Sequence, residues 1–335
     1  MNLRLSLLTL ALGTATLPAL ADEVNIYSHR QPELIQPLLD AFTAETGVAV
    51  NIAFVDKGMT ERLVAEGKRS PADLVLTVDI ARLMQLVEAG VTQPVDSEVL
   101  RANIPAEFRD AANQWFGLTS RARVLYASRD RVDDGEVTTY EDLASDKWKG
   151  RICTRSGTHD YNIALLGAMI AHHGTDVAKT WAEGLHANLA KKPDGGDRDQ
   201  VKAIWAGECD ISLGNTYYMG EMLANPDQKL WADAVRILFP TFEGGGTHMN
   251  ISGVAMTKAA PNHDAALKLM EWLSSDAAQA IYAETNNEFP VKPGVARSAL
   301  VQSWGDFTPD TLPLSEVASH RAEALRLMEE VNFDG

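Results

Sequence analysis

The chain has 335 residues, of which 46 are acidic and 30 are basic, so its formal net charge at pH 7 is −16. Such an acidic surface keeps a protein soluble and disfavours nucleic acid or an anionic bilayer as a partner. Without the 21 residues of the leader discussed next, 335 − 21 = 314 residues remain, which is enough for about two domains.

Residues 1–21 have the pattern of a signal peptide. Arg4 supplies a positive start, residues 5–17 are mostly apolar, and Ala19-Leu20-Ala21 forms a small-x-small cleavage site. A retained membrane anchor is the alternative, but the apolar run is short for a membrane span and Pro18 interrupts its end. We therefore predict export with cleavage near Ala21. No later stretch is apolar and long enough for direct membrane insertion.

Strands alternate with helices in the first hundred residues after the leader. Pro32 suits a first helical turn, and Gly47 and Gly90 suit helix ends. This alternation predicts an α/β domain with a largely parallel sheet. The predicted strands are 22–27, 48–55 and 73–78, and the predicted helices are 33–45, 59–66 and 80–88.

The same alternation resumes farther along the chain, which predicts a second lobe. A β-rich run over 115–128 is expected to cross into that lobe, and a strand at 235–239 to cross back. The amphipathic segment 314–331 is expected to pack across the first lobe. We predict lobe 1 from residues 22–122 plus 241–335 and lobe 2 from 123–240. Further strands are expected at 150–154, 209–213 and 251–256, and further helices at 140–144, 161–173, 176–190, 199–206 and within 264–284.

Two of these strands are each followed by a turn and a tyrosine. Tyr161 follows Cys153, and Tyr217 follows Cys209, at the same offset of 161 − 153 = 217 − 209 = 8 residues, and Tyr218 comes next. Neighbouring parallel strands would bring the three phenols to one spot, beyond the carboxyl ends of the strands where open α/β sheets bind ligands.

Phenols are unusual metal ligands. A free phenol has a pKa of about 10, so it takes a hard, highly charged ion to displace its proton, and a helix N-terminus favours the phenolate. Tyr161, Tyr217 and Tyr218 therefore predict a site for Fe(III), although an isolated tyrosine pair is more often core packing.

The charge of such a site suggests an additional ligand. Three phenolates neutralise Fe³⁺ and leave up to three positions of a six-coordinate shell, two of which a bidentate anion such as carbonate would fill. Arg30, Arg121 and Arg123 are candidates to hold that anion, because a guanidinium fork suits a planar oxyanion. His29 and His159 are candidates for supporting contacts. The alternatives are surface or salt-bridge arginines and a histidine that merely occupies a turn.

Cys153 and Cys209 are the chain's two cysteines. An even pair in an exported protein indicates a disulfide, and the shared offset from the tyrosines places the pair on neighbouring strands. Two buried free thiols are the alternative.

The sequence resembles the periplasmic ferric-iron-binding proteins of ABC transporters, the bacterial-transferrin-like group of extracellular solute-binding proteins. The resemblance implies a two-lobed type II binding-protein fold with hinge strands and a central ligand cleft. It also implies an iron site at Tyr161, Tyr217 and Tyr218, anion contacts at Arg30 and Arg121, and a periplasmic monomer that serves an inner-membrane permease. The matching segments are 25–30, 71–79, 117–123, 150–153, 214–218 and 250–253.

One departure from that family concerns the ligand set. Several members have a His-Tyr pair just after the first strand, where this chain has Gln31-Pro32. The departure removes one or two potential ligands and implies an exogenous ligand, as in the subgroup that uses carbonate.

Other functions remain open at this point. A binding protein for an organic or oxyanion solute, such as a phosphonate or polyamine, would share the fold and the arginines but would not need three convergent tyrosines. A sensory role, in which the loaded protein is presented to a receptor, is a further alternative. An exported enzyme is disfavoured, since the sequence has neither Gly-x-Ser-x-Gly nor His-Glu-x-x-His.

Overall fold

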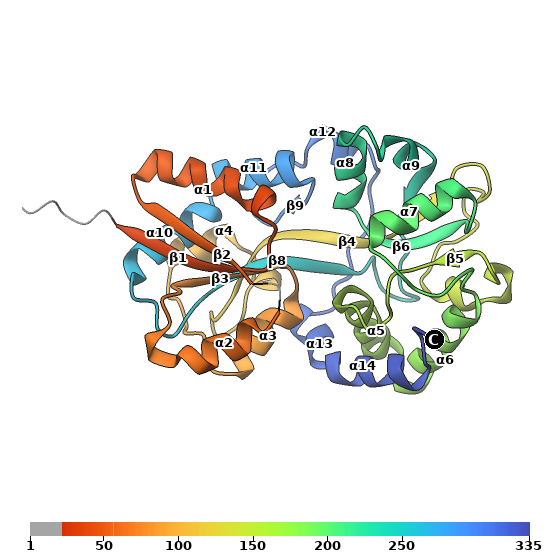
Figure 1. Ribbon diagram of the computed structural model, residues 1–335, viewed down its shortest axis with the longest axis horizontal. Helices are drawn as coiled ribbons and strands as arrows, with labels where there is room; N and C mark the ends of the chain where they lie inside the picture. Colours follow the sequence, from red (N-terminus) through yellow and green to blue (C-terminus); the bar gives the residue numbers. More distant parts are fainter. Residues whose placement is uncertain (1–21, 56) are drawn as a thin grey trace, which may run out of the picture.

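The computed structural model describes residues 22–55 and 57–335. The predicted signal peptide, residues 1–21, lies outside the described residues. Two α/β lobes lie side by side, and two long strands run from one into the other (Figure 1).

The first lobe is built on three parallel strands, as the alternating pattern predicted. β1 pairs with β2 on one side and with β3 on the other, with Tyr27 opposite Ala53 and Val75. Helices follow each of these strands and cover the sheet. The elements are β1 (Glu23–Ser28), α1 (Pro32–Thr46), β2 (Ala49–Phe54), α2 (Met59–Glu66), β3 (Leu74–Thr77), α3 (Ile80–Glu88) and α4 (Glu98–Asn103).

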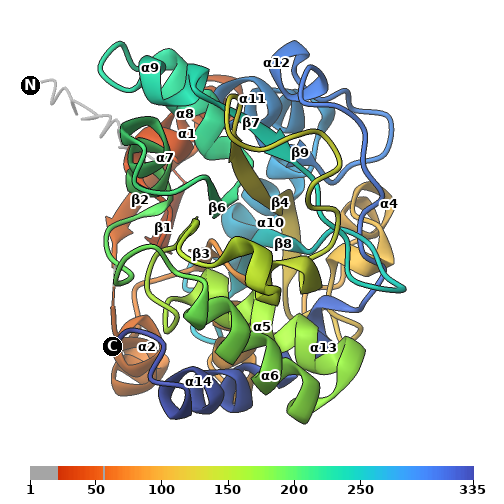
Figure 2. The same cartoon turned by 90° about the vertical axis from the view of Figure 1, so that its right-hand side faces the viewer.

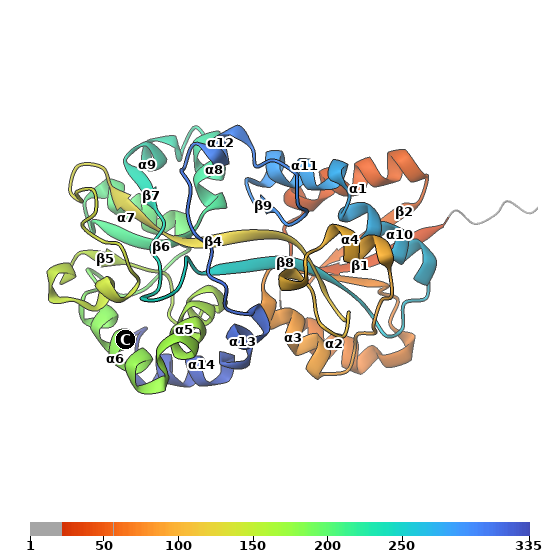
Figure 3. The same cartoon turned by 180° about the vertical axis from the view of Figure 1, so that it is seen from behind.

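The two connecting strands are β4 (Phe116–Ser128) and β8 (Met249–Met256), and every residue of both is buried. They pair antiparallel, with Arg121 opposite Asn250. β8 also pairs with β3, and β4 also pairs with β6 of the second lobe. One sheet in the order β2-β1-β3-β8-β4-β6-β5 therefore passes through both lobes (Figure 3).

The strand predicted to cross back does not do so. β7 (Val235–Leu238) pairs with the far end of β4, from Leu125 to Ser128, and so stays in the second lobe. The return crossing is made by β8 instead. In the sequence both segments read as strands, and only the pairing partner distinguishes a crossing strand from an edge strand.

The second lobe contains the neighbouring parallel strands that the cysteine–tyrosine spacing predicted. β5 (Ile152–Cys153) lies parallel to β6 (Ile211–Asn215), with Cys153 opposite Ser212. β6 extends through Gly214 and Asn215, which the sequence had indicated as a turn. Figure 2 shows this lobe from its outer end. Its helices are α5 (Asp160–His173), α6 (Thr175–Ala187), α7 (Asp197–Ala206), α8 (Tyr217–Ala224) and α9 (Lys229–Asp233).

The chain then returns to the first lobe and runs back toward the second. Four short elements after β8 cover the first lobe and lead away from it (Figure 1). They are α10 (His263–Leu273), α11 (Asp276–Asn286), β9 (Phe289–Pro290) and α12 (Ala299–Gln302).

The last two helices, α13 (Leu314–Ser319) and α14 (Arg321–Glu330), do not pack as predicted. α13 lies between α3 and α5, and α14 lies against α5 and α6. Val317, Leu327 and Met328 share a buried cluster with Leu166 of α5. The expected packing across the first lobe is therefore wrong for α14. Periodicity reveals an apolar face on a helix but not which partner covers it.

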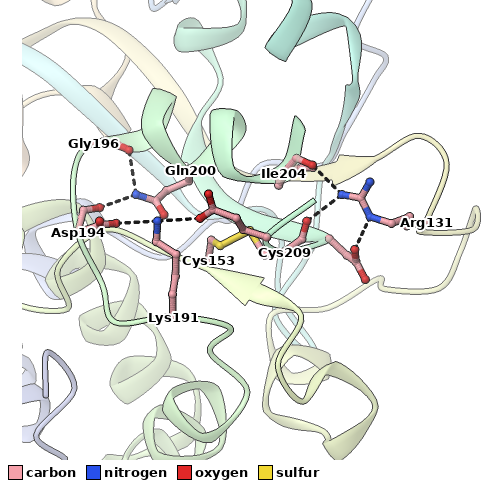
Figure 4. Close-up of a disulfide and its surroundings, with 10 residues drawn as sticks. Arg131, Cys153, Lys191, Asp194, Gly196, Gln200, Ile204 and Cys209 are labelled. Carbon is pink, nitrogen blue, oxygen red and sulfur yellow. Dashed lines mark hydrogen bonds and ion pairs between the residues drawn. A yellow bond between two sulfur atoms is a disulfide. The ribbon is translucent and has the colours of Figure 1, made fainter. Parts of the chain in front are cut away.

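A disulfide joins Cys153 to Cys209, with their Cα atoms 5.9 Å apart, and this confirms the predicted pairing and excludes free thiols. The Arg131 guanidinium donates to the carbonyl oxygens of Ile204 (2.7 Å) and Cys209 (2.9 Å) beside it (Figure 4). The bridge fastens the start of β6 to the end of β5. Across residues 22–55 and 57–335, no helix has the length and apolar character needed to span a bilayer.

Candidate metal centre

Three tyrosines meet where α5 and α8 begin. Tyr161 is the second residue of α5, and Tyr217 and Tyr218 are the first two residues of α8. The hydroxyl oxygens of Tyr161 and Tyr217 lie 3.2 Å apart, and the ring centroids of Tyr217 and Tyr218 are 4.3 Å apart. The parallel pairing of β5 with β6 produces this meeting, because each strand leads through a turn to its helix.

The surroundings favour the neutral form of the Tyr217 and Tyr218 phenols. Burial raises the pKa of Tyr217 well above its ordinary value, and the neighbouring Tyr161 and Tyr218 raise it further. Burial, followed by Tyr161, likewise raises the pKa of Tyr218. Three phenolates would repel one another at this separation. A multivalent cation would remove that repulsion as it displaced the protons.

Three guanidinium groups surround the Tyr161 ring. The Cζ atoms of Arg121, Arg123 and Arg155 lie 5.6, 5.7 and 5.2 Å from its centroid. These groups place positive charge beside the ring of a candidate ligand. Arg155 was not among the predicted residues, although its place between Cys153 and Tyr161 in the first turn could have indicated it.

Asp197 connects these arginines to the end of β6. Its Oδ2 accepts from Arg123 Nη1 (2.6 Å) and from the backbone N–H of Asn215 (3.0 Å), and its Oδ1 accepts from Arg155 (3.2 Å). Burial would raise the pKa of Asp197, but the two guanidiniums outweigh it and lower that pKa. A buried carboxylate therefore fixes the cationic groups behind the tyrosines. Asp197 was not among the predicted site residues and lies just before the predicted helix 199–206.

Arg30 and Arg121, the predicted anion contacts, meet at one hydroxyl. Arg30 Nη2 donates to Ser252 Oγ at 3.0 Å, and Arg121 Nη1 donates to the same atom at 3.2 Å. Arg30 also forms a buried ion pair with Glu288, and Arg121 donates to the carbonyl oxygen of Val78. Both guanidiniums are thus engaged within the protein, and an anion would reach only the N–H groups that these contacts leave.

The charge of Arg30 nevertheless interacts with the phenols. Burial lowers the pKa of Arg30, but Glu288, Tyr282, Tyr217 and Tyr161 together outweigh burial and raise that pKa. Arg30 follows β1 of the first lobe, whereas the phenols belong to the second. The site therefore receives charge from both lobes.

The two predicted histidines differ in position. The Nδ1 atom of His159 accepts from the backbone N–H of Tyr161 (3.2 Å) and caps α5, and the two rings lie 4.6 Å apart. Burial, followed by Arg155, lowers the pKa of His159 to about 4. His29 lies after β1, where its backbone N–H donates to the Leu76 carbonyl oxygen at 2.9 Å. The structure thus brings His159 into contact with Tyr161, and the backbone of His29 is bonded to β3.

An ion pair joins the lobes beside the tyrosines. Arg82 of α3 donates through Nε to Asp160 Oδ2 at 3.0 Å, and Arg321 of α14 donates to Asp160 Oδ1 at 3.2 Å. Burial would raise the pKa of Asp160, but Arg82 and Arg321 outweigh it and lower that pKa. Because Asp160 directly precedes Tyr161, the first lobe contacts the helix turn that carries a candidate ligand.

The tyrosines are also the donor set best suited to a metal among the residues described. No group of three or more histidine, cysteine, aspartate or glutamate side chains there is arranged to hold an ion. Phenolate oxygens are hard anionic donors, which select a hard, highly charged cation over a soft one. The arrangement is chemically suited to Fe(III).

Comparisons with known proteins find relatives over nearly the whole chain. The chain is 42% identical over 323 residues to Iron uptake protein A1 of Synechocystis sp., covering 95% of this chain and 89% of that protein. Apo ferric ion-binding protein A of Pasteurella haemolytica is 53% identical with a TM-score of 0.91, covering 94% of this chain and 99% of that one. A Trichodesmium protein in complex with iron and citrate ligands is 41% identical with a TM-score of 0.88, covering 93% and 99%.

The family model described as bacterial extracellular solute-binding protein matches residues 38–309. That match spans most of the chain, and the solved relatives superpose over nearly their whole length. The chain therefore belongs to the bacterial extracellular solute-binding proteins and has their two-lobed type II fold.

Proposed function

We propose that this protein captures Fe(III) through the phenolates of Tyr161, Tyr217 and Tyr218 and delivers it to an ABC permease. The observation that carries the proposal is the meeting of three phenols at two helix starts, with 3.2 Å between the hydroxyl oxygens of Tyr161 and Tyr217. Arg121 and Arg155 place positive charge beside the Tyr161 ring. Binding exchanges phenolic protons for one ion, so acid favours release.

The relatives support the choice of iron. Iron uptake protein A1 and ferric ion-binding protein A are named for iron, and both align with nearly the whole of this chain. Their family is described as bacterial extracellular solute-binding proteins. We infer transport of iron, with no catalytic step, and none of these relatives is named for a phosphonate or polyamine.

An exogenous anion completes the shell in this proposal. Three phenolates leave up to three positions of a six-coordinate ion, and Gln31-Pro32 supplies no His-Tyr pair to fill them. The Trichodesmium relative holds citrate together with iron. We infer that carbonate or a citrate-like carboxylate binds here, near Arg30 and Arg121, with His29 and His159 as supporting groups.

The proposal also includes where the protein works. The leader predicted over residues 1–21 would direct export, and cleavage near Ala21 would release the protein into the periplasm, where it acts as a monomer. The acidic balance of the chain keeps it from anionic lipid surfaces. The partner is the inner-membrane permease.

Titration with Fe(III), followed by visible absorption, tests this function. We expect a phenolate-to-iron charge-transfer band in the wild type and a weakened or shifted band in Tyr217→Phe and Tyr218→Phe. Tyr27→Phe is the control, because that phenol donates to Glu66 (2.9 Å) in the first lobe. A wild type that stays colourless with Fe(III), but gives calorimetric binding of a phosphonate or polyamine, would favour the alternative.

A further inference from the structure

The turn before α5 is held by a residue far along the chain. Asp334 Oδ1 accepts from the backbone N–H of Gly157 at 2.7 Å, and its Oδ2 accepts from the hydroxyls of Ser156 (2.5 Å) and Thr158 (3.3 Å). One carboxylate thus binds three consecutive residues. An ionised carboxylate makes stronger hydrogen bonds than a neutral acceptor does.

The turn packs tightly against Phe333, the residue before Asp334. Phe333 is 1% exposed and lies beneath Gly157, where an added Cβ would come within 2.5 Å of the Phe333 ring and 3.1 Å of Met328 Sδ. Only glycine fits at that distance, because the ring cannot retreat from a filled core. The segment after α14 is therefore fitted to the turn by shape as well as by hydrogen bonds.

The turn determines where Tyr161 lies. The carbonyl oxygen of Ser156 accepts from the backbone N–H of His159 (3.2 Å) and from Asn162 Nδ2 (3.1 Å). His159 in turn caps α5 by accepting from the Tyr161 N–H. A continuous chain of hydrogen bonds connects Asp334 to the backbone of Tyr161.

The other end of α14 contacts the same region. Arg321, at the start of that helix, pairs with Asp160, the residue before Tyr161. The segment 321–334 thus contacts the start of α5 at two points. Its apolar side chains pack in the core between these two contacts. A metal-ligating side chain needs such support if it is to keep a fixed position before the metal binds.

We propose that Asp334 is a positioning residue for the metal centre: it holds the 156–158 turn and thereby fixes the Tyr161 phenol opposite Tyr217. The proposal rests on the function proposed above for the three tyrosines. Without Asp334 the turn loses three hydrogen bonds, and Tyr161 samples positions from which its oxygen no longer meets the ion. Iron then leaves faster, although all three phenols remain.

Asp334→Ala tests the proposal with two readouts. In iron-free protein, hydrogen exchange at the Gly157 amide should accelerate, because that N–H loses its acceptor. In loaded protein, iron release to a chelator should be about 10- to 100-fold faster, the usual effect of losing a group that orients a metal ligand, and the visible band should shift. Asp334→Asn keeps one acceptor oxygen, so its rates of hydrogen exchange and iron release should lie between those of the wild type and of Asp334→Ala.

Glu330→Gln is the matched control. Glu330 belongs to α14, and its carboxylate pairs with Lys179 and Arg326 at the surface, away from the turn. The Glu330→Gln variant should leave hydrogen exchange at the Gly157 amide and the rate of iron release unchanged.

Two results would overturn the positioning role: exchange at residues 156–158 that is unaltered in Asp334→Ala, or faster exchange with an unaltered band and release rate. A wild type without any iron band would instead refute the proposed function, and the exchange data would still report whether Asp334 clamps the turn. The two failures are therefore distinguishable.

Discussion

The two lobes present different chemistry to the metal centre. The second lobe supplies the phenols, on helices that follow two neighbouring strands joined by a disulfide. The first lobe supplies Arg30, whose charge is already balanced by buried Glu288. The second lobe carries the candidate donors, and its surroundings keep the Tyr217 and Tyr218 phenols neutral. The first lobe carries a charge that is already paired.

This difference suggests an order of events. All three candidate donors belong to helices of the second lobe, so the ion can be captured there before the lobes close. The first lobe then contributes electrostatic support and the contact between Arg82 and Asp160. In this scheme closure retains the ion and capture does not depend on it.

The largest expected effect comes from removing a donor from the second lobe. Tyr161→Phe should lower iron affinity by at least about 100-fold, because even groups that only orient a ligand contribute about 10- to 100-fold. Tyr282→Phe is the counterpart in the first lobe, where the buried Tyr282 ring lies 6.0 Å from Arg30 Cζ. Competition titration against a chelator measures both variants, and equal losses would contradict the division between lobes.

Replacing Arg30 should damage the first lobe more than the capture of iron. Both partners of its ion pair are buried, at 6% and 2% side-chain exposure, and removing one partner of such a pair costs roughly 3–5 kcal/mol of unfolding free energy. We expect Arg30→Ala to lower urea stability by that amount while keeping the visible band. The double variant Arg30→Ala/Glu288→Ala should recover part of the stability. A band lost together with Arg30 would place a necessary ligand contact in the first lobe.

The effect of Arg30→Ala on iron retention should also depend on which anion is present. Iron retention by Arg30→Ala should fall most when carbonate is the available anion, and less with excess citrate, because a chelating anion depends less on one guanidinium. Release rates with carbonate excluded or supplied measure this. Rates indifferent to both carbonate and Arg30 would show that the shell is completed in another way.

The disulfide should matter for the stability of the second lobe. Its two cysteines are 56 residues apart, and closing a loop of that length contributes at most about 4 kcal/mol in the chain-entropy model. Cys153→Ser/Cys209→Ser should therefore unfold at lower urea concentration. Thiol titration of denatured, unreduced wild type should find no free thiol, and finding two would refute the bridge.

The smallest expected effect comes from removing the ion pair between the two lobes. Arg82 and Asp160 are partly exposed, with 25% and 17% side-chain exposure, so Arg82→Ala should cost only about 0.2–1 kcal/mol. It should nevertheless reduce the difference in radius of gyration between iron-free and loaded protein, measured by X-ray scattering. Arg62→Ala, which breaks a pair with Glu66 within α2, is the control. Identical profiles for iron-free and loaded wild type would show that the centre is preformed without closure.

The sequence by itself determined the fold class, the disulfide pairing and the meeting of Tyr161, Tyr217 and Tyr218. These features depend on local order: short strands, the turns that follow them and an equal offset from cysteine to tyrosine. Parallel pairing of the two strands places the turns that follow them at the same edge of the sheet, although Cys153 lies opposite Ser212 and not opposite Cys209. The boundaries of the two lobes stay a prediction.

Only the tertiary structure decided which groups support the site. Arg30 is paired with a residue 258 positions away, and Ser156 with one 178 positions away. Asp197 and Arg155 were not predicted as site residues, and α14 packs against a different lobe from the one expected. No periodicity records such contacts, because they depend on which apolar faces meet and on which buried charges then find partners.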